Sequence, residues 1–139
     1  MAEGTSTQRR GRGKALDDLL NGLIQASRDF EGAVLVSLDG LMYATAWSSD
    51  DQTERLQALD DSDIGAVACR AFAQSGEATR MLERGDLDRL ILAGVNGNMI
   101  ITRAGENALC VALLKPDAKL GVASFEAKRI SQEIAKVLG

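Results

Sequence analysis

The side chains that could carry out catalysis are few in this sequence. Adjacent carboxylates, which can transfer protons when burial raises the pKa of one of them, occur in three places: Asp17-Asp18, Asp50-Asp51 and Asp60-Asp61. All three pairs fall where we expect a solvent-facing position or the start of a helix. The 139 residues contain no histidine, so the commonest general base and the commonest ligand of zinc, copper and non-haem iron are missing. We therefore expect no catalytic residue, no metal site and no cofactor.

Nucleophilic side chains are present, but nothing near them in the sequence would activate them. Cys69 and Cys110 lie in an apolar helical pattern and an apolar strand pattern, where a free cysteine behaves as a small hydrophobic side chain. Ser124 and Ser131 lie on a predicted helix with no base close by in the sequence. We interpret all four side chains as structural.

Two short segments have the composition of a ligand-binding loop. Residues 60–63 (Asp-Asp-Ser-Asp) could offer oxygen ligands to a cation, but they lack the glycine and the distant glutamate of a calcium loop. We interpret them as the capped, acidic start of a helix. Residues 94–97 (Gly-Val-Asn-Gly) have neither the lysine nor the following helix of a phosphate-binding loop, so they predict a hairpin turn.

Charge is distributed unevenly along the chain. Residues 1–14 carry four basic side chains and one acidic one, a net charge of +3, whereas the remaining residues carry a net charge of −7. The acidic remainder argues against a nucleic-acid-binding surface on the folded domain. The basic segment could contact RNA, an anionic membrane or an acidic partner. The favoured alternative is a disordered tail over residues 1–13, because chain termini are often untethered.

Apolar periodicity defines the elements that would have to position any site. It predicts helices over residues 14–29, 62–84 and 118–138, with Gly85 capping the second helix. It predicts strands over residues 33–38, 41–47, 87–93, 99–103 and 108–114. Asp39-Gly40 predicts a tight turn between the first two strands.

Two finer predictions concern which side chains face the core. The second helix has an apolar stripe that we expect to be buried, made of Ile64, Val67, Ala68, Ala71, Phe72, Ala78, Thr79 and Leu82. Tyr43 and Trp47 lie four residues apart on one predicted strand and should share a face. They would form either a recognition patch or, more commonly, core packing under a helix.

The element order is α-β-β-α-β-β-β-α, which predicts an α/β (α+β) fold with a single five-stranded antiparallel sheet and three helices. The strands are too apolar for a sheet with one wet face, so we expect both faces to be covered. We predict one domain over residues 14–139 after the tail. No apolar run is long enough to span a bilayer, and no signal peptide is recognisable, so we expect a cytoplasmic protein without a transmembrane segment.

The run LDRLILAGVNGNMIITRAGENALCVALLKPDAKLG (residues 87–121) resembles the second half of the roadblock/dynein light chain family. The matching features are the turn at Gly97, the AGENAL turn at residues 104–109 and the Leu120-Gly121 pair. The first half agrees in element order, so the resemblance covers about residues 14–138. It implies a roadblock/profilin-like fold, similar to the single-domain bacterial or archaeal regulators of gliding-motility GTPases.

The resemblance also implies a mode of action. Family members pair as dimers through the third strand and the second helix, and pairing would cover a strand that is otherwise an exposed apolar edge. The candidate dimer residues are Leu90, Ile91, Leu92, Ala68, Ala71 and Phe72. The usual partner of the family is a small Ras-like GTPase, for which the candidate contact residues are Arg70, Gln74, Glu77 and Arg80.

We therefore expect a non-catalytic homodimeric regulator or scaffold that binds a small Ras-like GTPase and modulates its nucleotide cycle or localisation. Activation of GTP hydrolysis, nucleotide exchange and scaffolding all stay open. The alternative is a profilin-like or longin-like sensory domain that binds a small ligand, and an enzyme is the least favoured class because no nucleophile–base or metal constellation is present.

Overall fold

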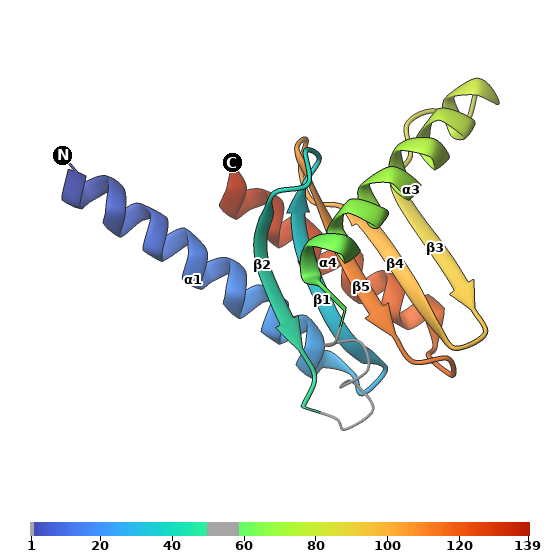
Figure 1. The fold of residues 1–139 in the computed structure, drawn as a ribbon, viewed down its shortest axis with the longest axis horizontal. Helices are drawn as coiled ribbons and strands as arrows, with labels where there is room; N and C mark the ends of the chain where they lie inside the picture. Colours follow the sequence, from blue (N-terminus) through green and yellow to red (C-terminus); the bar gives the residue numbers. More distant parts are fainter. Residues whose placement is uncertain (1, 50–58) are drawn as a thin grey trace.

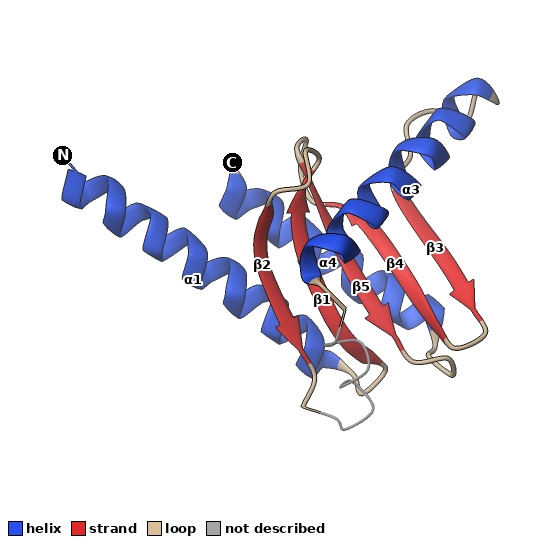
Figure 2. Ribbon diagram, in the orientation of Figure 1, coloured by secondary structure: helices blue, strands red, loops and turns tan. Residues whose placement is uncertain are grey.

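The computed structural model describes residues 2–49 and 59–139. Over these residues the chain forms three helices and five strands (Figures 1 and 2). In chain order they are α1 (Ala2–Ala26), β1 (Phe30–Ser37), β2 (Met42–Trp47), α3 (Asp61–Met81), β3 (Arg89–Gly94), β4 (Gly97–Arg103), β5 (Ala108–Leu114) and α4 (Leu120–Leu138). The predicted element order is confirmed, and residues 50–58, which include the Asp50-Asp51 pair, lie outside the described residues.

The five strands form one sheet in the order β2-β1-β5-β4-β3, and every neighbouring pair is antiparallel. Every residue of β1 and β5 is buried, because these two strands lie at the centre of the sheet and both of its faces are covered. This burial explains why residues 33–36 of β1 and all of β5 are apolar. The prediction of a single antiparallel sheet covered on both faces is confirmed.

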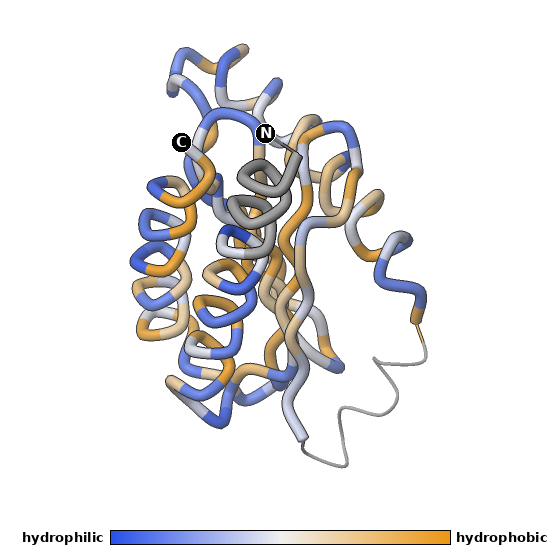
Figure 3. Tube along the Cα trace, turned by 90° about the vertical axis from the view of Figure 1, so that its left-hand side faces the viewer, coloured by the Kyte–Doolittle hydropathy of each residue, from blue (hydrophilic) through white to orange (hydrophobic). Residues whose placement is uncertain are grey.

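The helices form a layer on each side of the sheet, which is visible from the side in Figure 3. Helices α1 and α4 cover one face, where Leu20, Leu23 and Ile134 are completely buried against the strands. Helix α3 covers the other face through Ile64, Ala68 and Phe72. The sheet therefore separates two hydrophobic clusters, an α1–α4 cluster and an α3 cluster.

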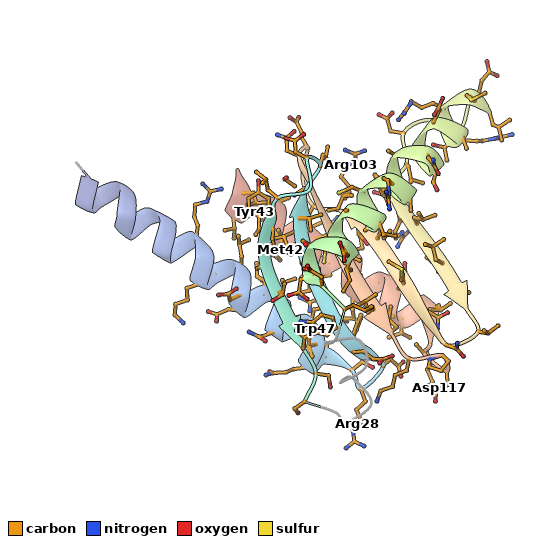
Figure 4. All side chains as sticks on the ribbon, viewed as in Figure 1. Arg28, Met42, Tyr43, Trp47, Arg103 and Asp117 are labelled. Atoms are coloured by element: carbon orange, nitrogen blue, oxygen red, sulfur yellow. The ribbon has the colours of Figure 1, made fainter. Side chains whose placement is uncertain are left out.

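A β-bulge in β2 overturns one prediction about facing. Leu35 pairs with Ala44 but Val36 pairs with Met42, so Tyr43 is an extra residue in the ladder. Trp47 packs into the α3 cluster, whereas Tyr43 lines a groove on the α1–α4 side together with Arg12. Both Tyr43 and Trp47 are labelled on β2 in Figure 4. The prediction that Tyr43 and Trp47 share a face was wrong, because the bulge shifts the alternation by one residue.

The boundaries of two helices differ from the sequence prediction. Helix α1 begins at Ala2 rather than near residue 14. Helix α3 ends at Met81, where Glu83 adopts a φ of 58° and the Arg84 N–H donates to the Thr79 carbonyl at 2.7 Å. Those are the features of a Schellman cap with Glu83 in the left-handed position. The prediction that Gly85 caps this helix was therefore wrong.

The start of α3 agrees with the interpretation of the acidic cluster. Asp60 is the N-cap, and its carboxylate accepts hydrogen bonds from the Ser62 hydroxyl at 2.8 Å and the Ser62 backbone N–H at 3.0 Å. These two bonds, the hydroxyl first, lower the pKa of Asp60 below its ordinary value. The cluster at residues 60–63 therefore caps a helix, as its sequence predicts.

Candidate partner-binding surface

Strand β3 forms one edge of the sheet. It pairs with β4 on one side, and no other described strand lies on its outer side. Leu90 is half-buried against the α3 cluster, while Ile91 and Leu92 remain 45% and 40% exposed. An uncharged strand centre with free backbone groups and half-exposed apolar side chains is a template for pairing with another strand.

The outer face of α3 carries the four residues proposed to contact a partner. Arg70, Gln74, Glu77 and Arg80 are all exposed, and their spacing of four, three and three residues places them along one side of the helix. Arg80 approaches Asp86 at 3.8 Å, but both side chains are largely in solvent, so this ion pair contributes little to stability. The structure thus brings these four side chains together on a polar, mixed-charge surface.

The C-terminal end of α3 extends past the sheet beyond β3 and β4 (Figure 1). Because this end lies outside the sheet, Met81 and Leu82 are 75% and 71% exposed. Val67, earlier on the helix, is also half exposed. Val67, Ala78 and Leu82 belong to the stripe predicted to be buried, and for these three residues the prediction was wrong, because all of them are exposed. Val67 and Leu82 are exposed because of the position of the helix on the sheet. The periodicity of the sequence does not predict that position.

Two of the six candidate dimer residues serve the chain's own core. Ala68 is completely buried, and Phe72 is 4% exposed in the α3 cluster. The Arg103 guanidinium, labelled in Figure 4, lies 5.3 Å from the centre of the Phe72 ring, a cation–π distance. Their side chains therefore hold α3 on the sheet, while Ala71, Leu90, Ile91 and Leu92 keep surface that a second molecule can contact.

The thiols have no catalytic arrangement. Cys69 donates to the Ser37 carbonyl at 3.4 Å, and partial burial raises its pKa. Cys110 is completely buried, and burial raises its pKa to about 11. A thiol with a raised pKa carries little thiolate at neutral pH and is a poor nucleophile.

Burial of Cys110 makes stability fall at high pH. The thiol has an ordinary pKa of 9.0 and a folded pKa of about 11, so the protonated form stabilises the fold fully below pH 9, and this contribution is lost as the pH rises toward 11. We expect a loss of about 1 kcal/mol from this group between pH 7 and pH 10. Urea unfolding at both pH values measures it, and Cys110→Ala should remove this part of the pH dependence. If the free energy of unfolding still falls between pH 7 and pH 10 in Cys110→Ala but no longer does so in Cys69→Ala, the pH dependence does not come from Cys110.

Other features of the described residues limit the chemistry. No group of three or more Cys, Asp or Glu side chains there is arranged to hold a metal ion. A groove of about 620 Å³ lies between α4 and the turn at residues 104–107, and its walls mix acidic and basic side chains. Within the described part of the chain, no helix is both long and apolar enough to cross a membrane.

Comparison with known proteins identifies the fold. The sequence matches the family model for the Roadblock/LC7 domain over residues 16–114, which is more than half of the chain. The chain belongs to the Roadblock/LC7 domain family. Members of this family are regulators rather than enzymes. A comparison with curated protein sequences finds no match.

Solved structures of roadblock proteins are similar over almost the whole chain. Gliding protein MglB from Thermus thermophilus has a TM-score of 0.78 at 16% identity, covering 91% of this chain and 90% of that one. An MglB with a tetrameric arrangement has a TM-score of 0.77 at 17% identity, covering 91% and 89%. A Roadblock/LC7 domain from Streptomyces avermitilis has a TM-score of 0.73 at 21% identity, covering 88% and 96%. At these identities the similarity establishes a shared fold.

Proposed function

We propose that this roadblock domain is a non-catalytic regulator or scaffold that forms a homodimer and binds a small Ras-like GTPase. The observation that carries the proposal is the open edge of β3, on which Ile91 and Leu92 are half exposed. Monomeric proteins usually protect such an edge with charge, proline or a covering element. Nothing in the described residues protects the centre of β3 in these ways.

Pairing two β3 strands antiparallel would give a closed, two-fold symmetric dimer with one continuous sheet. The symmetry axis would pass beside Ile91 or Leu92, the central residues of the strand, because directly opposed residues of an antiparallel pair point to the same face of the sheet. Because α3 extends past the sheet near β3, the same rotation would carry Met81 and Leu82 toward the second copy. The same dimer would thus cover both the apolar edge of β3 and the apolar C-terminal end of α3.

The two α3 helices of such a dimer would lie on the same side of the joined sheet. Each brings Arg70, Gln74, Glu77 and Arg80 to a shared polar surface, which we assign to the GTPase. All four of these side chains are exposed, so none of them is a buried acid–base group. An effect on GTP hydrolysis would therefore act by reshaping the GTPase rather than through a catalytic group of this domain.

Leu92→Asp should weaken self-association at least tenfold, because Leu92 points to the same face as Leu90 and its replacement would bury an unpaired carboxylate on the α3 side of the joined sheet. Light scattering at tens of micromolar measures the mass: we expect twice 14.8 kDa for the wild type and a shift toward 14.8 kDa for the variant. Val122→Asp is the matched control, since Val122 is also an exposed apolar residue but lies on α4. Circular dichroism checks that both variants fold.

The same variants test the GTPase interaction. Purified Ras-like GTPases from the organism that encodes the chain, loaded with GDP or a non-hydrolysable GTP analogue, should bind the wild type and Val122→Asp but not the monomeric variant. A wild type that is monomeric at tens of micromolar would overturn the dimer and favour the ligand-binding sensory alternative. A wild type that forms a dimer but binds none of these GTPases would contradict the assignment of the partner and leave the dimer standing.

A further inference from the structure

The basic side chains at the start of the chain are set apart from an acidic body. Residues 1–14 have a net charge of +3 against −7 for the remainder, and Arg9, Arg10, Arg12 and Lys14 lie within six positions. Arg12 and Lys14 are exposed in the structure. We call residues 9–14 the basic segment.

The basic segment lies where helix α1 leaves the domain. The first α1 side chain in the hydrophobic core is Leu16, and Arg12 makes a long contact of 3.5 Å with the Leu138 carbonyl at the end of α4. Before Arg12 the helix continues past the edge of the sheet (Figure 1). At 1.5 Å per residue this part of α1 adds about 15 Å. The basic segment occupies the inner end of this part, because Arg9 lies only about 4.5 Å farther along the axis than Arg12, and Arg12 and Lys14 are exposed to solvent there.

The composition of this part of α1 restricts what it can recognise. Residues 2–14 contain no apolar side chain larger than alanine and no aromatic. They offer neither a hydrophobic face to a partner helix nor a ring on which a nucleic-acid base could stack. The four basic positions span about 200° of the helix circumference, which suits a broad anionic surface better than a narrow pocket.

An acidic protein partner would need an apolar centre in its interface, which residues 2–14 cannot match. Two broad anionic surfaces are left, a nucleic acid and an anionic bilayer. A nucleic acid long enough to give strong binding would also run along the domain, where a net charge of −7 repels it. A bilayer can be reached by the projecting helix while the acidic body stays in solution. From this geometry we propose that the basic segment of α1 docks the domain on membrane surfaces that contain anionic lipids.

Sedimentation with lipid vesicles tests the proposal. The full chain should bind phosphatidylcholine vesicles that contain about 30% phosphatidylserine and not pure phosphatidylcholine vesicles, and raising the salt should release it. Each basic side chain near such a surface contributes about fivefold to binding. Replacing Arg9, Arg10, Arg12 and Lys14 together with glutamine should therefore lower the binding constant by more than about 100-fold.

The control variant removes the same charge from elsewhere. Glutamine at Arg28, Arg70, Arg80 and Arg84, all exposed, gives the same net charge and should keep most of the vesicle binding. The proposal would be overturned if the two variants lost vesicle binding equally. It would also be overturned if the wild type bound vesicles with and without phosphatidylserine equally well. Binding of a short DNA duplex that depends on the basic segment, at a salt concentration where phosphatidylserine vesicles are not bound, would overturn it as well. The test does not require self-association or a GTPase, so its failure would leave the proposed function standing.

Discussion

Phe72→Ala is expected to lower the free energy of unfolding by about 3–5 kcal/mol, the range found when a buried aromatic side chain is truncated in a core. Phe72 is almost completely buried and is the largest side chain that α3 contributes to the α3 cluster. Its removal leaves a cavity between the helix and the sheet. It also removes the ring beneath the Arg103 guanidinium.

Chemical denaturation with urea measures this loss, and two further variants make the result specific. Phe125→Ala truncates the same residue type where it is 66% exposed on α4, so we expect a change within about 0.5 kcal/mol. Phe72→Leu refills most of the volume and should recover more than half of the loss. A loss below about 1 kcal/mol in Phe72→Ala would mean that α3 is not held on the sheet by this side chain.

The same substitution bears on function. Helix α3 has one buried side and one exposed side, and the exposed side carries Arg70, Gln74, Glu77 and Arg80. Because Phe72 fixes the helix on the sheet, loosening it should weaken partner binding even though its side chain never reaches the surface. Binding measured well below the unfolding transition separates this effect from simple unfolding.

Gly65→Val is the second substitution with a large expected effect, a loss of about 1–3 kcal/mol from overpacking. Helix α3 approaches β1 so closely at Gly65 that an added Cβ would lie 2.7 Å from Val36 Cγ1. Val36 is completely buried and short, so neither it nor the helix can move without disturbing the α3 cluster. The matched control is Gly22→Val in α1, where an added Cβ meets nothing within 4 Å. The control should change stability by less than about 0.5 kcal/mol, because valine and glycine differ little in helix propensity.

A double variant identifies the contact itself. Val36→Ala makes room opposite residue 65, so Gly65→Val should cost less in that background than in the wild type. Urea unfolding of the four proteins gives the coupling free energy. Strictly additive losses would show that the close approach of Gly65 to Val36 does not cause the destabilisation.

Much of the fold could be read from local patterns in the sequence. The five apolar strand runs, the turn residues between them and the periodic stripes of α3 and α4 are properties of short segments, and they predicted the element order and the antiparallel sheet. The cap at Asp60 was equally local, since it depends on a side chain and backbone groups within two residues. The basic segment could be recognised from charge, but its backbone was missed as part of α1, because a helix that does not pack on a core leaves no apolar periodicity.

The sequence by itself determined the order of the elements, the covering of both sheet faces and the absence of histidine-based chemistry, because periodicity, turn residues and composition are local. Only the tertiary structure decided which apolar side chains remain in solvent. The bulge at Tyr43 depends on how β2 pairs with β1, and the exposure of Met81 and Leu82 depends on how far α3 extends past the sheet. Both depend on segments that are distant in sequence, so no pattern within one segment reports them. The candidate partner-binding surface lies where α3 and β3 meet, and it therefore exists only in the folded chain.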